Sequence, residues 1–206
     1  MNLCQMNKII SINKEFGIVI IEPGVTQIQL FNYLKENNLP FMFNVTDSSA
    51  KTSIICNCLD RGVGYFSSRV EDVLGIELIA GSGKIFNTGF GHYQEAKANF
   101  LYPYGVGPDT SGLFFQSNFG IITNIAFRLI PEPQSKMSIL CGLQDASKLM
   151  DYIQELSNLR KENVYDSEMH IANSKRSNIA ILPHIKKYLK EEFFYNEMDA
   201  KKKLYN

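Results

Sequence analysis

Two stretches of the sequence gather residue types that can hold an anion or a heterocycle. Residues 46–65 are rich in small hydroxyl side chains and end in a glycine-containing turn. Residues 104–122 join a glycine- and proline-rich loop to a polar turn that leads into an apolar strand pattern. Small side chains let a ligand approach the backbone, and hydroxyl and N–H groups can bind phosphate oxygens. A capped surface helix and a plain loop-to-strand junction are the alternative interpretations.

A third candidate, the tetrapeptide Gly81–Lys84, does not match a phosphate-binding P-loop. Its lysine is followed by Ile85 rather than Ser or Thr, and Leu78 stands where the first glycine should be. The G-x-G pairs of the sequence also lack the third glycine of a Rossmann dinucleotide site. The three histidines and the C-x-C at residues 56–58 do not fit a metal-ligand pattern, so we expect no metal site.

The composition is that of a globular protein. The chain has 206 residues, of which 45% are hydrophobic and 20% charged, enough for one or two domains. Lys+Arg and Asp+Glu both number 21, which argues against nucleic-acid binding. The longest apolar runs have strand length, so we expect no membrane span. No secretory signal is visible, which predicts a cytoplasmic location and free thiols.

Hydrophobic periodicity predicts the elements that position the two stretches. Strands are expected over residues 8–12, 16–21, 73–80, 85–88 and 121–130, with a helix from its Thr26 N-cap to about Asn37. Beyond Pro131 and Pro133 we expect strands over 139–143 and 165–171 and helices over 145–159 and 183–195. This order predicts an α+β protein with a first domain over residues 1–133 and the beginning of a second over 134–206.

Four blocks of the sequence resemble the flavoprotein family of vanillyl-alcohol oxidase and 4-cresol dehydrogenase (p-cresol methylhydroxylase, PCMH). They begin at Met6, Ser53, Gly75 and Tyr104 and read MNKIISINKEFGIVIIEPGVT, SIICNCLDRGVGY, GIELIAGSGKIFNTGFG and YGVGPDTSGLFFQSNFGIITNIAFRLIPEP. A shorter block, SEMHIANSKR from Ser167, resembles the start of that family's substrate domain. The resemblance covers nearly all of residues 6–176.

The resemblance implies a partial PCMH-type FAD-binding domain followed by the start of a ferredoxin-like cap (substrate) domain. It implies FAD as the cofactor and oxidation of small para-substituted phenols by hydride transfer to the flavin. By that matching, the residues lining the flavin and pyrophosphate would be Ser53, Ile54, Asn57, Asp60, Arg61, Gly64 and Tyr65. The backbone of Ile121 and Ile122 would face the adenine end. Asp60 would act as a catalytic base or tune the flavin.

The chain also departs from the family pattern. The family's upstream strand–loop–strand segment and most of its substrate domain have no counterpart here, and Cys56 stands where the family has glycine. We therefore expect a fragment or one part of a split enzyme, with little activity alone. The alternatives are a non-catalytic subunit that binds a complementary chain, and a degenerate fragment without a role. Exposed apolar surface would favour a homo-oligomer or a complementary chain as partner.

Overall fold

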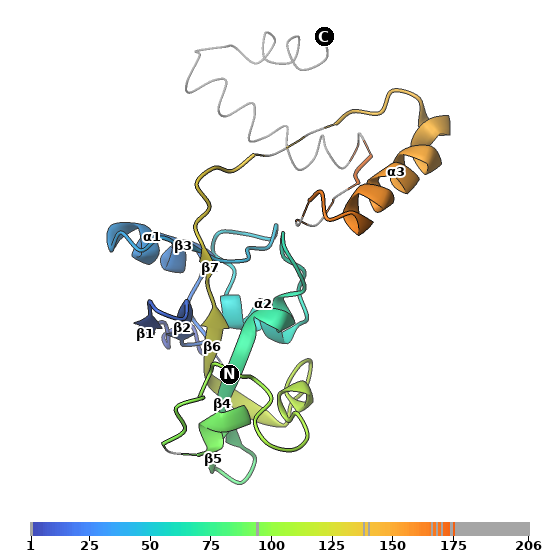
Figure 1. Ribbon diagram of the computed structural model, residues 1–206. Helices are drawn as coiled ribbons and strands as arrows, with labels where there is room; N and C mark the ends of the chain where they lie inside the picture. The colour runs from blue at the N-terminus through green and yellow to red at the C-terminus, as the bar shows by residue number, and fades with distance from the viewer. Residues whose placement is uncertain are drawn as a thin grey trace. The chain divides into compact units, whose positions relative to one another are not determined.

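A five-stranded antiparallel sheet, with the order β1-β2-β6-β4-β5, forms the centre of the fold (Figure 1). The computed structural model describes residues 2–93, 95–137, 139, 141–165, 167, 169, 171–173 and 175. The strands are β1 (Ile9–Asn13), β2 (Ile18–Ile21), β4 (Val73–Ala80), β5 (Ile85–Asn87) and β6 (Gly120–Arg128). β6 pairs with β2 along one edge and with β4 along the other. The last of these strands in the sequence therefore joins two earlier hairpins.

Side chains alternate between the two faces of this sheet, as the period of a strand requires. One face carries the main core, in which Val19, Ile76 and Phe127 are buried together with Leu30 of α1 (Gln27–Glu36) and Ile54 of α2 (Ile54–Leu59). The opposite face carries a smaller cluster. Its members are Ile18, Leu74 and Ala126, with Ile20 and Phe100 packed against them. The core thus lies between the sheet and the segments that contain α1 and α2.

Helices α1 and α2 both start at a hydroxyl cap. The Thr26 side chain accepts a hydrogen bond from the Gln29 N–H, as the sequence predicts, and α1 ends at its C-cap Asn37. The Ser53 side chain caps α2 in the same way. A separate two-stranded sheet pairs β3 (Phe41–Met42) with β7 (Ile130–Pro131), and so ties the chain after α1 to the end of the main sheet.

The α+β class and the strands, hairpin and first helix of residues 8–130 are confirmed. The strand expected over 139–143 is wrong, because residues 139 and 141–143 adopt no strand and Ile139 is 74% exposed. In the described part of the chain no strand pairs with these residues, so no sheet partner takes up their backbone groups. The helix expected over 145–159 is a 3-10 turn (Ala146–Lys148) followed by α3 (Leu149–Lys161).

Some expectations concern positions that the structure does not cover. In the strand expected over 165–171, residues 165, 167, 169 and 171 adopt no strand, and the remaining positions lie outside the described residues. The helix expected over 183–195 lies wholly outside them. The domain boundary between residues 133 and 134 stays a prediction. The elements above belong to one compact unit, Met1–Glu168.

The four cysteines are free thiols in very different surroundings. Cys4, Cys56 and Cys141 are exposed, whereas Cys58 is buried in α2. Burial raises the pKa of the Cys58 thiol to about 12, against the opposing charge of Arg69. At pH 8 we expect iodoacetamide to modify the three exposed thiols while Cys58 reacts only in urea, because the thiolate is the nucleophile. Peptide mass spectrometry of native and denatured samples measures this, and rapid native labelling of Cys58 would contradict it.

Candidate functional site

The two candidate stretches meet at Gln116. Its backbone N–H donates to the Leu59 carbonyl (2.9 Å), and its side-chain Nε2 donates to the Asp60 carbonyl (3.2 Å), across 56 positions of sequence. Arg61 and Gln116 both have a left-handed backbone, with φ of 55° and 53°. The turn that ends α2 and the turn that leads into β6 therefore form neighbouring parts of one surface.

Ser53 and Ile54 anchor the start of α2. The Ser53 hydroxyl accepts from the Cys56 N–H (3.2 Å) and donates to the Pro23 carbonyl (2.6 Å). The Ile54 N–H donates to the Val25 carbonyl (3.1 Å), and its side chain is fully buried. The polar groups of these two residues are thus used to hold α2, and their predicted contact with the flavin stays a prediction.

Asn57 carries an acceptor for which the described part of the chain offers no donor. Its Oδ1 is buried without a hydrogen-bond partner there. Gly62 lies against the same amide, which a Cβ at that position would overlap. A buried unpaired acceptor is destabilising, so an N–H or O–H donor supplied by a ligand fits this position. Asp60, the C-cap of α2, and Arg61 are exposed next to it.

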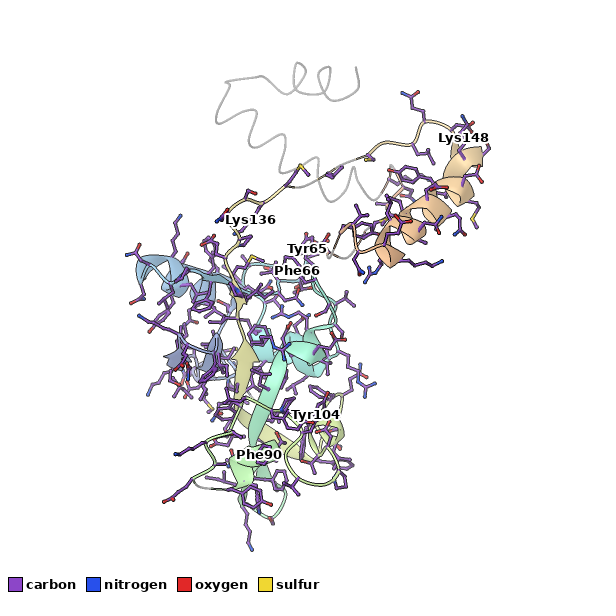
Figure 2. All side chains as sticks on the ribbon, viewed as in Figure 1. Tyr65, Phe66, Phe90, Tyr104, Lys136 and Lys148 are labelled. Atoms are coloured by element: carbon purple, nitrogen blue, oxygen red, sulfur yellow. The ribbon has the colours of Figure 1, made fainter. Side chains whose placement is uncertain are left out.

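Gly64 and Tyr65 lie in the loop that follows. Gly64 is buried against the Asn44 amide, and a Cβ on Gly64 would overlap that amide. The Tyr65 N–H donates to the Val45 carbonyl (3.2 Å), and its hydroxyl donates to the Asp47 carboxylate. That hydrogen bond, and to a smaller extent partial burial, raises the pKa of the Tyr65 hydroxyl. Figure 2 shows Tyr65 and Phe66 at one end of the sheet, and Phe90 and Tyr104 toward the other end.

Among the described residues, β6 has a strand partner on one side only at Ile121 and Ile122. They pair with Ile79 and Leu78 of β4, whereas the pairing of β6 with β2 ends at Ile125. The Ile122 side chain belongs to the main core, and Ile121 is 36% exposed. A strand edge without a partner presents N–H and C=O groups. Such an edge fits the predicted backbone contact with the cofactor.

Sequence patterns missed a buried polar network beneath these loops. Gln27, Asn44, Arg69 and Asp72 are all buried. Burial raises the pKa of Asp72, and its hydrogen bond from Asn44 and the charge of Arg69 oppose that rise. Asn44 also begins the glycosylation sequon of residues 44–46, but its burial leaves the amide inaccessible to modification.

The described residues contain no cluster of His, Cys, Asp and Glu able to hold a metal ion. Nor does any helix among them combine the length and apolar character that crossing a membrane requires.

Comparison with known proteins gives consistent matches. Residues 1–89 match the model of the FAD binding domain family. The chain is 32% identical to the 4-cresol dehydrogenase [hydroxylating] flavoprotein subunit of Pseudomonas putida, over 84% of this chain and 34% of that protein. It is 35% identical to the 1'-carboxy-chondrochloren decarboxylase of Chondromyces crocatus, over 76% of this chain and 30% of that protein.

Solved structures agree with these relatives. Substrate-bound p-cresol methylhydroxylase has a TM-score of 0.75 and 32% identity, over 81% of this chain and 33% of that chain. The isoeugenol complex of 4-ethylphenol oxidase from Gulosibacter chungangensis has a TM-score of 0.68 and 26% identity, over 75% of this chain and 30% of that chain. The chain thus spans about a third of the length of these proteins.

Proposed function

The chain belongs to the FAD-binding flavoprotein family that includes 4-cresol dehydrogenase, and on that premise we propose that residues 53–65 and 116–122 form its FAD-binding surface. FAD supplies the two-electron chemistry of this family by accepting a hydride when bound. The observation that carries the proposal is the pair of hydrogen bonds by which Gln116 joins the two turns. These two hydrogen bonds bring together residues that the resemblance assigns to one cofactor.

Each group on this surface has a role that its chemistry suits. The unpartnered Asn57 Oδ1 would accept a hydrogen bond from an N–H or O–H of the cofactor. The exposed Arg61 would attract the pyrophosphate, and the backbone of Ile121 and Ile122 would offer polar groups along the open edge of β6. Gly64 would contact the cofactor through its backbone, because the space where its Cβ would lie is occupied by the Asn44 amide. The exposed Asp60 carboxylate would take a proton from the substrate.

We further propose a small para-substituted phenol as the substrate class and a second polypeptide as partner. The names of two relatives, 4-cresol dehydrogenase and 4-ethylphenol oxidase, support the phenol. The flavoprotein-subunit name of the first relative and exposed apolar residues such as Phe119 (64% exposed) support a complementary chain or a second copy as partner. Light scattering at several concentrations tests the partner, and a monomer throughout would exclude the second copy.

The test of the cofactor is the visible spectrum of the purified chain after mixing with FAD and desalting. We expect retained flavin bands, and weaker retention in Gln116→Ala, which loses the side-chain bond between the two turns. Gln154→Ala is the matched control, because the Gln154 side chain donates to Asn158 Oδ1 within α3, a helix with no buried residues. A protein that stays colourless in saturating FAD would contradict the proposal.

Asp60→Asn tests the proposed base. The amide keeps the shape of the side chain but cannot take a proton, so we expect FAD binding to be retained and flavin reduction by 4-cresol to slow at least about 100-fold. Anaerobic stopped-flow absorbance measures the reduction. Glu71→Gln, at another exposed acid, should reduce flavin at the wild-type rate. Equal rates in Asp60→Asn and wild type would remove Asp60 from the mechanism.

A further inference from the structure

The two loops that flank α2 are each tied to the core by one buried side-chain amide. Residues 46–52 dock on Gln27, which is 6% exposed, and residues 62–68 dock on Asn44, which is 0% exposed. A buried amide is tolerated only when its donors and acceptors are paired. Both amides use loop backbone for this purpose, so the conformation of each loop is coupled to one side chain.

Gln27 holds the first loop from the first turn of α1. Its Nε2 donates to the carbonyls of Ser49 (2.8 Å) and Thr46 (3.2 Å), and its Oε1 accepts from the Thr46 N–H (2.9 Å). Backbone N–H groups of the same helical turn donate to the carbonyls of Ala50 and Thr52. The N–H groups that a helix leaves unpaired at its start are thereby satisfied by the loop.

Asn44 holds the second loop through both polar atoms of its side-chain amide. Its Oδ1 accepts from the Phe66 N–H (3.1 Å), and its Nδ2 donates to the Ser67 carbonyl (3.1 Å) and to Asp72 Oδ2 (2.9 Å). The absence of a side chain at Gly64 leaves the space that this amide occupies. Both polar atoms of the Asn44 side-chain amide are therefore hydrogen-bonded, either to the backbone of the loop or to the buried Asp72.

Arg69 connects the two amides through the core. Its Nη1 donates to Gln27 Oε1 (3.1 Å), and its guanidinium lies 5.4 Å from the centre of the Phe127 ring. The positive charge of Arg69 acts on Asp72, the carboxylate that Asn44 binds. The two loops thus share one buried polar support rather than two independent ones.

The loops also meet at their tips, where the Tyr65 hydroxyl donates to the Asp47 carboxylate. From these contacts we propose that Asn44 is a positioning residue of the flavin site, which sets FAD affinity by fixing the backbone of Phe66 and Ser67 rather than by touching the cofactor. The proposal rests on the proposed function, because it presumes that residues 62–68 border FAD.

The main test is Asn44→Ala in the full chain. Because the loop loses its fixed support, we expect the Kd for FAD, measured by flavin fluorescence, to rise about tenfold or more. We also expect trypsin to cleave native protein without FAD faster after Lys51, in the first loop, and after Arg61, which directly precedes the second loop, because both residues are exposed. This second measurement needs no cofactor.

Two further variants separate positioning from general destabilisation. Thr88→Val removes a buried hydroxyl that accepts from the Ile76 N–H in the β4–β5 hairpin. It should lower the melting temperature while leaving the Kd for FAD and the two cleavage rates within about twofold of wild type. Asp47→Ala breaks the bond between the loop tips at an exposed site, so it should fold normally and raise the Kd about threefold.

Two results would overturn the inference. One is wild-type FAD affinity in Asn44→Ala. The other is an equal rise in Kd and cleavage rate in Asn44→Ala and Thr88→Val, which would reduce Asn44 to a general stabiliser. Failure of the proposed function has a different signature, in which wild-type protein binds no FAD while the cleavage rates still distinguish Asn44→Ala from Thr88→Val.

Discussion

Gly64→Ala is expected to abolish tight FAD binding and to destabilise the domain. A Cβ at residue 64 would overlap the Asn44 amide, which is fully buried and held by the Phe66 N–H, the Ser67 carbonyl and Asp72. The amide cannot withdraw without breaking those bonds, so the loop must move. Overpacking of this kind costs about 1–3 kcal/mol. Urea denaturation and FAD titration measure the two effects.

Gly81→Ala is the matched control for this substitution. Gly81 lies in the turn between β4 and β5, and a Cβ there meets no atom within 4 Å. We expect its free energy of unfolding to stay within about 0.5 kcal/mol of wild type and its FAD affinity to be unchanged. Wild-type affinity and stability in Gly64→Ala would show that the loop tolerates a side chain at residue 64, and would contradict the close packing of residues 44 and 64.

The largest loss of stability is expected from Phe127→Ala. Phe127 is fully buried on the central strand β6, where its ring meets Phe43 edge-to-face (6.4 Å between centroids) and lies under the Arg69 guanidinium. Removing the ring leaves a cavity and takes the π-face away from a buried cation. Such truncations cost about 3–5 kcal/mol, a large part of the stability of an ordinary domain.

The urea midpoint of Phe127→Ala, compared with that of Phe119→Ala, measures this loss. Phe119 precedes the same strand and is 64% exposed, so its truncation should change the free energy of unfolding by less than about 0.5 kcal/mol. Similar midpoints for the two variants would mean that β6 is not the centre of the core.

Local pattern was sufficient to predict most of the sheet. The apolar run of residues 73–80 predicted β4 with the bounds that the structure has, and Thr26 predicted the start of α1, because both signals lie within a few residues. The same kind of signal failed at residues 139–143. A strand also needs a partner, and no local pattern states whether one exists.

The candidate site was only partly predictable, because local sequence does not show which distant residues become partners. The resemblance named residues of both turns, and the structure joins these turns through Gln116. Asn44, the positioning residue that we propose, was not predicted because its partners Ser67 and Asp72 lie 23 and 28 positions away. A polar residue beside an apolar run gives no local sign of whether distant backbone will satisfy it.

Because β6 lies at the centre of the sheet, the domain cannot complete its fold during synthesis until this strand has been made. The β1–β2 and β4–β5 hairpins leave the ribosome first, yet an isolated hairpin is marginally stable in water. Both hairpins pair with β6, and Arg128 of β6 pairs with Ile18, which lies 110 positions (128 − 18) earlier in the sequence. Until that last strand emerges, both hairpins present apolar faces and open edges, so chaperone engagement of the nascent chain should end once the strand has been released.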